Sequence, residues 1–132
     1  MWNDVKNQDG LDVLLETYGG FHDSCIKEIH YISGAYVTEN LYMQPMNNLN
    51  SLRIVFQRQY LNPMEIEVEF NGLVKLNLEP ANTSYTCEIL DVSFFFENDM
   101  VYWGDSFLFE TQRNEYAGIW LQAAEVRWRI VK

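Results

Sequence analysis

Few of the residues on which metal and redox sites depend occur in this sequence. Among 132 residues there are two cysteines and two histidines. Two cysteines are too few for the disulfide framework of a small secreted domain, so reduced thiols and a cytoplasmic protein are expected. Two histidines exclude a histidine-rich zinc site. Since no phosphate-binding loop and no GxSxG, CxxC or HExxH motif occurs either, we expect no metal, no cofactor and no enzyme activity.

Basic residues are also scarce. Nine Lys and Arg stand against 19 Asp and Glu, which gives a formal net charge of −10. Nucleic acids and anionic membranes both attract Lys and Arg, so this charge argues against nucleic acid and membrane as partners. The same charge is compatible with solubility alone, and it also suits a basic protein partner reached by electrostatic steering.

Long apolar runs are missing as well. None approaches the roughly 18 residues of a membrane span, and the first residues, MWNDVKNQDG, lack the basic start and apolar centre of a signal peptide. Hydrophobic residues nevertheless make up 48% of the chain and aromatic residues 15%, too many for a disordered protein. The length suits one core, so residues 1–132 are expected to form a single domain.

A helical pattern of apolar residues appears only near the N-terminus. It predicts one helix over about residues 9–18, with Asp9 as the N-cap. Asn7 is an alternative start. Gly19-Gly20 is the expected C-terminal stop, because glycine adopts the left-handed conformation at little cost.

The rest of the chain has the pattern of strands joined by turns. The clearest strand is PMEIEVEF, in which apolar residues alternate with Glu65, Glu67 and Glu69, so the two sets face opposite sides of a sheet. Further strands are expected at residues 24–32, 35–43, 52–57, 74–78, 89–96, 101–103 and 126–130.

Two dipeptides predict changes of direction between these strands. Asn71-Gly72 indicates a turn or a bulge, and Asn98-Asp99 indicates a hairpin turn. Short turns between strands are typical of antiparallel pairing. The sequence therefore predicts an α+β domain, with one N-terminal helix followed by a mainly antiparallel sheet of about seven strands.

Residues 18–31, YGGFHDSCIKEIHY, concentrate the polar groups that are best able to do chemistry. An imidazole beside a carboxylate, as in His22 and Asp23, forms a metal-ligand pair or a general base with its orienting group. His30 lies about 26 Å further along a strand at roughly 3.3 Å per residue, so the two histidines cannot share an ion. The alternative is that His22 and Asp23 satisfy backbone groups where the helix ends. Cys25 needs a histidine to become a nucleophile, and a small buried cysteine is the more usual case.

Glu65, Glu67 and Glu69 form the best-defined surface feature. Three carboxylates on one face can bind a basic protein surface, and we take them as the candidate partner-binding residues. A solvated sheet face with alternating polar residues is the ordinary alternative. Arg127 and Arg129 of the last strand can also face the three glutamates as cross-strand pairs, which would cancel their charge.

Three short segments are similar to one group of proteins. The run GGFHDS before an Ile-rich strand resembles the "FHD" start of small uncharacterised bacterial proteins of the immunity-protein type, including the family called immunity protein 50. VEFNGLVKLNLEP is similar to their F-x-G-V/L-x-x-L-x-L step, and AAEVRW resembles their final A-x-x-x-x-W strand. The resemblance implies a small acidic cytoplasmic protein that binds and blocks a toxin, and it brings no catalytic residues.

The leading hypothesis is a non-enzymatic acidic binding protein, and the resemblance favours an immunity protein that neutralises a bacterial toxin. Two other classes stay open. One is a small-ligand-binding module or an enzyme that uses His22 and Asp23, with Cys25 nearby. The other is a structural domain without a site of its own. The sequence indicates neither the identity of a partner nor the oligomeric state.

Overall fold

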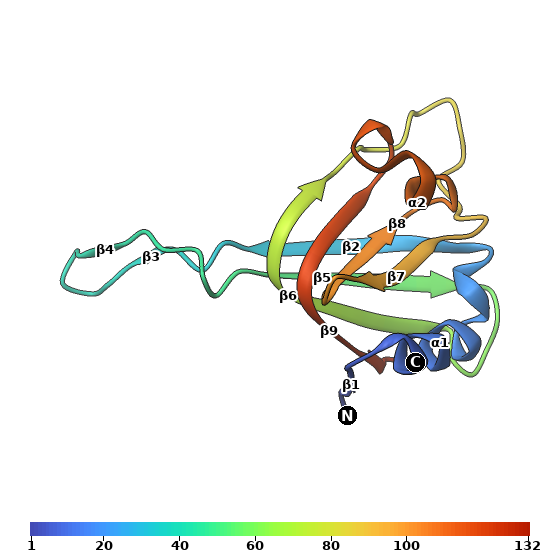
Figure 1. Ribbon diagram of the computed structural model, residues 1–132, viewed down its shortest axis with the longest axis horizontal. Helices are drawn as coiled ribbons and strands as arrows, with labels where there is room; N and C mark the ends of the chain where they lie inside the picture. The colour runs from blue at the N-terminus through green and yellow to red at the C-terminus, as the bar shows by residue number, and fades with distance from the viewer.

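A curved antiparallel sheet forms the body of the protein in the computed structural model, which describes all 132 residues (Figure 1). Six strands follow one another in hydrogen-bonded order, and β1 pairs with the second half of β9, beyond the end of β8. Every strand pair is antiparallel, which confirms the predicted type of sheet. In spatial order the strands are β2 (Ser24–Ile32), β5 (Ser51–Arg58), β6 (Glu65–Asn77), β9 (Trp120–Ile130), β8 (Met100–Gly104) and β7 (Ser93–Glu97), with β1 at Asn3–Val5.

Two short α-helices accompany the sheet, α1 (Gln8–Thr17) and α2 (Leu108–Gln112). The expectation of a single helix ahead of all strands is wrong in part, because β1 precedes α1 and α2 lies between β8 and β9. A helix of five residues is too short for a periodic apolar pattern, which is why the sequence did not predict α2. Neither α-helix has the length and apolar character needed to cross a lipid bilayer.

Local hydrogen bonds decide where α1 begins and ends. Asn7, rather than Asp9, is the N-cap, and its side-chain oxygen accepts a hydrogen bond from the backbone N–H of Gly10 at 3.0 Å. Gly19-Gly20 follows the helix with φ values of 60° and 66°. This left-handed conformation suits glycine, and the pair ends the helix as predicted.

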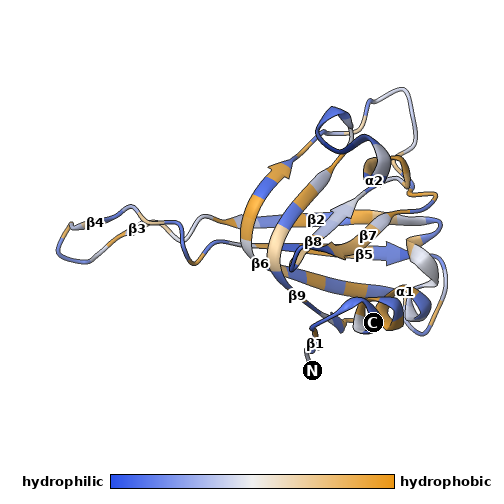
Figure 2. Cartoon of the chain, in the orientation of Figure 1, coloured by the Kyte–Doolittle hydropathy of each residue, from blue (hydrophilic) through white to orange (hydrophobic).

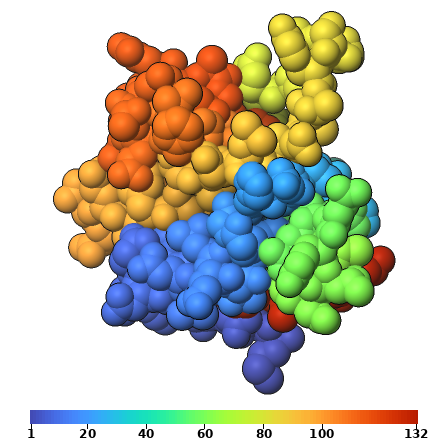
Figure 3. Space-filling model, turned by 90° about the vertical axis from the view of Figure 1, so that its right-hand side faces the viewer, coloured from blue at the N-terminus to red at the C-terminus, as the bar shows by residue number.

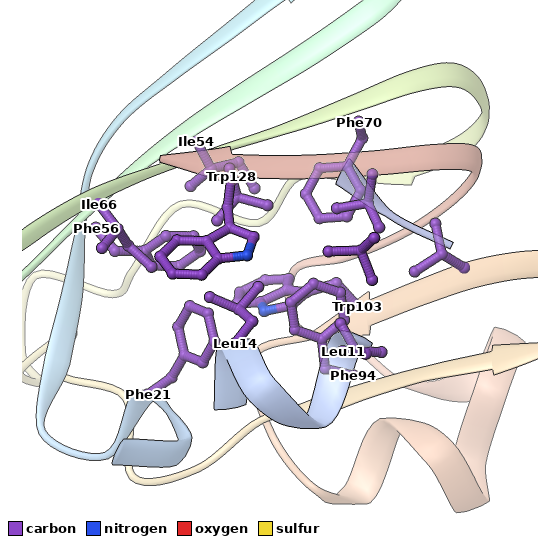
Figure 4. Packing of buried hydrophobic residues seen from close by; sticks show 14 of the residues in the cluster. Leu11, Leu14, Phe21, Ile54, Phe56, Ile66, Phe70, Phe94, Trp103 and Trp128 are labelled. Carbon is purple, nitrogen blue, oxygen red and sulfur yellow. The ribbon is translucent and has the colours of Figure 1, made fainter. Parts of the chain in front are cut away.

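The hydrophobic core fills the space between α1 and the inner side of the curved sheet (Figure 4). Phe21, which directly follows the glycine pair, is fully buried and meets Phe56 of β5 edge-on, with ring centroids 4.8 Å apart. Figure 2 shows the alternation of apolar and polar residues along the long strands that builds this inner side. The inward residues of β5 and β6 are all fully buried, as their spacing predicts: Leu52, Ile54, Phe56, Ile66, Val68 and Phe70.

Strand β6 bends at Asn71-Gly72 instead of ending there. Its register with β9 shifts between Leu73 and Lys75, and Gly72 has a φ of 66°. Of the two predicted alternatives, turn or bulge, the structure therefore has a bulge. The bulge lets a single strand of 13 residues follow the curvature of the sheet.

Asn98-Asp99 forms the predicted hairpin turn between β7 and β8. Both residues have positive φ, 52° and 62°, as a two-residue type I′ turn requires and as Asn and Asp tolerate. The strand expected at residues 89–96 begins later, at Ser93. Ile89 instead forms an isolated bridge with Ser24, which attaches the segment before β7 to the edge of β2.

The largest departure from the expected strands lies in residues 31–49, called the arm from here on. The single extended run predicted at residues 35–43 is interrupted, because β3 (Tyr36–Val37) and β4 (Met43–Gln44) pair with each other across a turn. The resulting narrow hairpin projects away from the body beyond β2 and β5 (Figure 1). Its outer strand edges have no further strand beside them.

Replacement of Gly72 by alanine is expected to destabilise the protein by about 1–2 kcal/mol, because an L-residue at positive φ is strained. The added Cβ would also lie only 3.0 Å from the Cβ of Ala124. Gly10→Ala is the matched control: Gly10 lies within α1 with its nearest new neighbour at 3.5 Å, so alanine should stabilise by up to about 1 kcal/mol. Urea unfolding measures both free energies, and equal losses in the two variants would contradict the role of Gly72.

Candidate functional site

Glu67 lies at the centre of an ion-pair network on the outer face of the sheet. Its Oε1 accepts a hydrogen bond from Nη1 of Arg53 on β5 at 2.8 Å. Its Oε2 accepts from Nη2 and Nε of Arg129 on β9 at 2.7 and 3.0 Å. Because β5 and β9 flank β6, one carboxylate connects three neighbouring strands through charge-assisted hydrogen bonds, which are about twice as strong as neutral ones.

Glu65 and Glu69 extend this network along β6. Glu69 pairs with Arg127, its cross-strand neighbour on β9, at 2.8 Å. Glu65 accepts a hydrogen bond from the side chain of Gln57 at 2.6 Å and lies 3.8 Å from the ammonium group of Lys27. All three glutamates of β6 therefore have a polar or cationic partner.

Trp2 covers the arginine side of the network. The guanidinium carbons of Arg127 and Arg129 lie 4.4 and 4.5 Å from the centroid of its ring. This is the geometry of a cation–π interaction with the face of an indole. Because β1 pairs with β9, the residue just before β1 is held against these arginines.

The predicted partner-binding residues thus lie side by side, but cations already match their charge. Glu65 and Glu67 are only 5% and 4% exposed. Of the arrangements considered from the sequence, the one observed has Arg127 and Arg129 facing the glutamates as cross-strand pairs. A basic partner would have to displace arginines in order to reach these carboxylates, which makes them a poor first point of contact.

The protonation of Glu67 reflects this pairing. Burial is the largest single influence and by itself would raise the pKa of the carboxyl group. Hydrogen bonds and charge attraction from Arg129 and Arg53 together outweigh burial, and the pKa of Glu67 lies below its ordinary value. The resulting stabilisation is present above the pKa of the unfolded chain and is lost as the pH falls through the lower pKa of the folded state.

An open hollow of about 460 Å³ adjoins the network. Arg53, Glu67 and Arg129 line it together with Glu28 and His30 of β2, whose side chains are 3.2 Å apart. Each of these five groups already has a partner of opposite sign or a hydrogen-bond partner. A charged ligand would therefore compete with existing pairs, and the hollow is a weaker candidate site than its volume suggests.

His22 and Asp23 lie at the junction between α1 and β2. Nδ1 of His22 donates to the carbonyl oxygen of Leu90 at 2.6 Å, and Nε2 lies 3.2 Å from Oδ2 of Asp23. The backbone N–H of Asp23 donates to the carbonyl oxygen of Ile89 at 2.7 Å. Figure 3 shows the chain that follows α1, in light blue, beside the yellow segment that precedes β7. The contacts are those of a braced junction, one of the two interpretations that the sequence left open.

The other histidine and the cysteine of residues 18–31 form no hydrogen bond or ion pair with His22 or Asp23. His30 lies on β2 and pairs with Glu28, so each histidine has its own carboxylate. Cys25 is a half-buried free thiol that lines a separate open hollow of about 310 Å³, with Arg58 and Asp23 among its walls. No group of three or more His, Cys, Asp or Glu side chains converges in a way that would hold a metal ion.

Exposed apolar side chains are concentrated on the arm. Isolated apolar residues at a surface are ordinary, but a contiguous set marks an interaction site. Nine large apolar side chains of the arm are more than half exposed: Tyr31, Ile32, Tyr36, Val37, Leu41, Tyr42, Met43, Met46 and Leu49.

The tip of the arm is held by its own hydrogen bonds. The backbone N–H of Thr38 donates to the carbonyl oxygen of Tyr42 at 2.9 Å, and the N–H of Tyr42 donates back to Oγ1 of Thr38 at 3.1 Å. Leu41, with a φ of 66°, is 84% exposed at this turn. A preformed turn loses less conformational entropy on binding, so its apolar side chains are well prepared for a partner.

Sequence reasoning missed the arm as a candidate site. A signal was present: residues 31–49 contain one charged residue, Glu39, whereas 21% of the whole chain is charged. Such a stretch is equally typical of a buried strand, because an apolar run does not reveal what covers it. Only the projection of the hairpin distinguishes the two cases.

Comparisons with known proteins point to no relative. No protein-family model matches the chain, and neither the curated proteins nor the solved structures give a match.

Replacement of Glu67 by glutamine is expected to lower the free energy of unfolding at neutral pH by about 1–3 kcal/mol, the range for hydrogen bonds to charged groups. Because the pKa of Glu67 is depressed, the wild type loses this advantage as the pH falls below the ordinary carboxyl range. Urea unfolding at several pH values should therefore show that the difference between wild type and variant shrinks towards acid pH.

Glu97→Gln is the control for this measurement. Glu97 pairs with Arg113 at 2.9 Å, but its side chain is 48% exposed, and an exposed pair contributes at most about 1 kcal/mol. A difference between wild type and Glu67→Gln that does not change with pH would contradict the assigned ionisation.

Proposed function

We propose that this protein acts by binding another protein and not by catalysis. The observation that carries the proposal is the arm, a projecting hairpin with nine large apolar side chains more than half exposed. Exposure on this scale costs solubility unless a partner covers it, because apolar surface in water is unfavourable. The arm is therefore the docking element of the proposal, in place of the three glutamates of β6.

The negative charge of the body indicates that the proposed partner is positively charged. Only Glu65, Glu67, Glu69 and Glu97 form ion pairs with Lys or Arg, so most of the 19 acidic side chains keep their charge uncompensated by a close cation. Exposed carboxylates around α1 illustrate this: Asp4, Asp9, Asp12 and Glu16. Such a field accelerates the approach of a basic protein, and its effect falls with ionic strength.

A basic bacterial toxin is the partner that we propose in particular, with this protein as its cytoplasmic immunity protein. The proposal is supported by the net charge of −10 and by the resemblance of GGFHDS, VEFNGLVKLNLEP and AAEVRW to immunity proteins. In this proposal the acidic body steers the toxin and the apolar arm supplies contact area. Electrostatic complementarity contributes mainly to the rate of association and buried apolar area mainly to affinity.

Removal of the arm tests the docking role. Residues 35–48 can be replaced by Asn-Gly, because the backbone of Leu49 already lies against Gly34 and a two-residue turn closes such a hairpin. The variant should unfold at nearly the temperature of the wild type, since the core cluster contains no residue of the arm. Capture of the protein encoded by the neighbouring gene should weaken at least about tenfold, or 1.4 kcal/mol, in titration calorimetry.

The dependence of the association rate on salt tests the steering role of the body separately from the docking role of the arm. If the body steers the partner, association measured by stopped flow should slow as salt is raised from about 0.01 M to 0.15 M, where the Debye length falls from about 30 to 8 Å. Unchanged affinity of the armless variant would refute the docking role of the arm. If wild-type protein does not retain the neighbouring gene product even at low salt, the toxin proposal fails.

A further inference from the structure

We propose that a second hollow, between α2 and β6 on the outer face of the sheet, binds a small organic anion that consists of one carboxylate joined to a planar ring. Neither the arm nor a protein partner takes part in this binding. The hollow has a volume of about 410 Å³, within the range of roughly 300–1,000 Å³ of small-molecule sites, and shares no lining residue with the hollow beside the ion-pair network. The lining residues that matter for binding are Lys75, Tyr102, Arg113, Asn114, Trp120 and Gln122.

Cross-strand neighbours form the floor of this hollow. Lys75 of β6 is the register partner of Gln122 on β9, and Gln122 is in turn the partner of Tyr102 on β8. Leu121 and Trp103, which adjoin Gln122 and Tyr102 along the chain, are fully buried in the core. Since successive residues of a strand face opposite sides, Gln122 and Tyr102 point outward. One row across three strands thus brings an ammonium group, an amide and an aromatic ring together.

Helix α2 forms one wall, because Gly104 leaves room for it on the sheet. Gly104 of β8 is the partner of Trp120 on β9, and a Cβ on Gly104 would lie only 2.5 Å from the Cβ of Phe109 on α2. The ring of Phe109 stacks on that of Trp120, with centroids 5.1 Å apart. From β6, Nζ of Lys75 lies 5.8 Å from the centroid of Trp120. The indole of Trp120 therefore contacts both the helix and the lysine.

Arg113, directly after α2, forms the rim and has a strained backbone. Its φ of 47° and ψ of −120° lie outside the regions that L-residues normally adopt. Nη2 of Arg113 donates to both carboxylate oxygens of Glu97, at 2.9 and 3.1 Å. The guanidinium carbon lies 4.7 and 5.1 Å from the ring centroids of Phe95 and Tyr102. Strain of this kind is concentrated at ligand-binding and active sites, and here it places Arg113 and Asn114 at the edge of the hollow.

The charges of the lining residues favour an anion. Among five surface hollows, this is the one in which basic side chains outnumber carboxylates. Glu97 is paired with Arg113, whereas Lys75 forms no ion pair, so one positive charge is left without a partner. A carboxylate carries one negative charge at neutral pH and matches it. A phosphate monoester would bring a second negative charge to a protein whose net charge is already −10.

The uncharged part of the lining favours a planar ring. Val74 lies at the point where the register of β6 shifts, and it is 58% exposed. A ring in the hollow would cover Val74 and the exposed part of Tyr102, and aromatic rings pack well against such surfaces. The side-chain amides of Gln122 and Asn114 can donate hydrogen bonds to the carboxylate. A few polar groups around an apolar surface are the usual composition of a small-molecule site.

Benzoate, benzamide and acetate test the class of ligand in NMR titrations of the wild type. Benzoate should shift the side-chain amide signals of Gln122 and Asn114 with a dissociation constant below about 5 mM, a weak affinity that suits so few atoms. Benzamide lacks the charge and acetate lacks the ring, so each should bind several-fold more weakly. A dissociation constant of benzoate above this limit overturns the inference. Binding of benzamide or acetate that is as tight as that of benzoate also overturns it.

Lys75→Gln tests the position of the site, with Lys6→Gln as the matched control. Both lysines are exposed and form no ion pair, and both substitutions remove one positive charge, but only Lys75 lines this hollow. Lys75→Gln should weaken benzoate binding at least about fivefold, because the ammonium group is the unpaired charge that the carboxylate meets. Lys6→Gln should leave the affinity unchanged. Equal effects of the two substitutions, or no effect of Lys75→Gln, would contradict binding in this hollow.

Discussion

The pairing of Glu67 with Arg53 and Arg129 is the interaction on which the arrangement of the sheet depends. Strand β6 lies between β5 and β9, and the first part of its outer face carries three carboxylates, those of Glu65, Glu67 and Glu69. Burial of such a group is costly unless cations and hydrogen bonds match it. Since one arginine comes from each flanking strand, a slip of either strand by one residue would turn its arginine to the core and leave Glu67 without its partner.

The same alternation builds the inner side. The residues of β6 between the glutamates point into the core, where the ring of Phe56 lies between those of Phe21 and Trp103 in the contact series, with centroid distances of 4.8 Å to Phe21 and 5.5 Å to Trp103. Phe21 reaches this site because Gly19-Gly20 turns the chain sharply after α1. The conformation of residues 18–31 is thus set mainly by the connection between α1 and β2. His22 stabilises this connection through its hydrogen bond to the carbonyl oxygen of Leu90.

The body and the arm divide the protein into two regions with opposite surfaces. The body buries a hydrophobic core and exposes many carboxylates, with exposed apolar residues scattered over its surface, whereas the arm concentrates exposed apolar side chains and carries a single charge. A hairpin of this kind has too few strands to form a core of its own. Hydrogen bonds between Thr38 and Tyr42 close its tip. Its exposed apolar side chains are the reason why the arm rather than the glutamates of β6 carries the proposed function.

Local rules account for most of the fold. The glycine stop, the strand at residues 24–32, the buried face of β5 and β6 and the turn at Asn98-Asp99 follow from propensities and from period-two alternation, which need only neighbouring residues. Within the candidate site, the clustering of the three glutamates was predictable from the same alternation. Neither the helix α2 nor the late start of β7 was predictable from the sequence, because an element of five residues is too short to show a periodic pattern of apolar residues.

Composition and period-two alternation are enough to predict an acidic protein with a mainly antiparallel sheet and a stripe of carboxylates along one strand. Tertiary structure alone decided whether that stripe meets water or arginines, since this depends on which strands become neighbours. It also decided that residues 31–49 leave the body. An apolar run has the same sequence pattern whether another layer covers it or not, so its exposure is a property of the assembled fold.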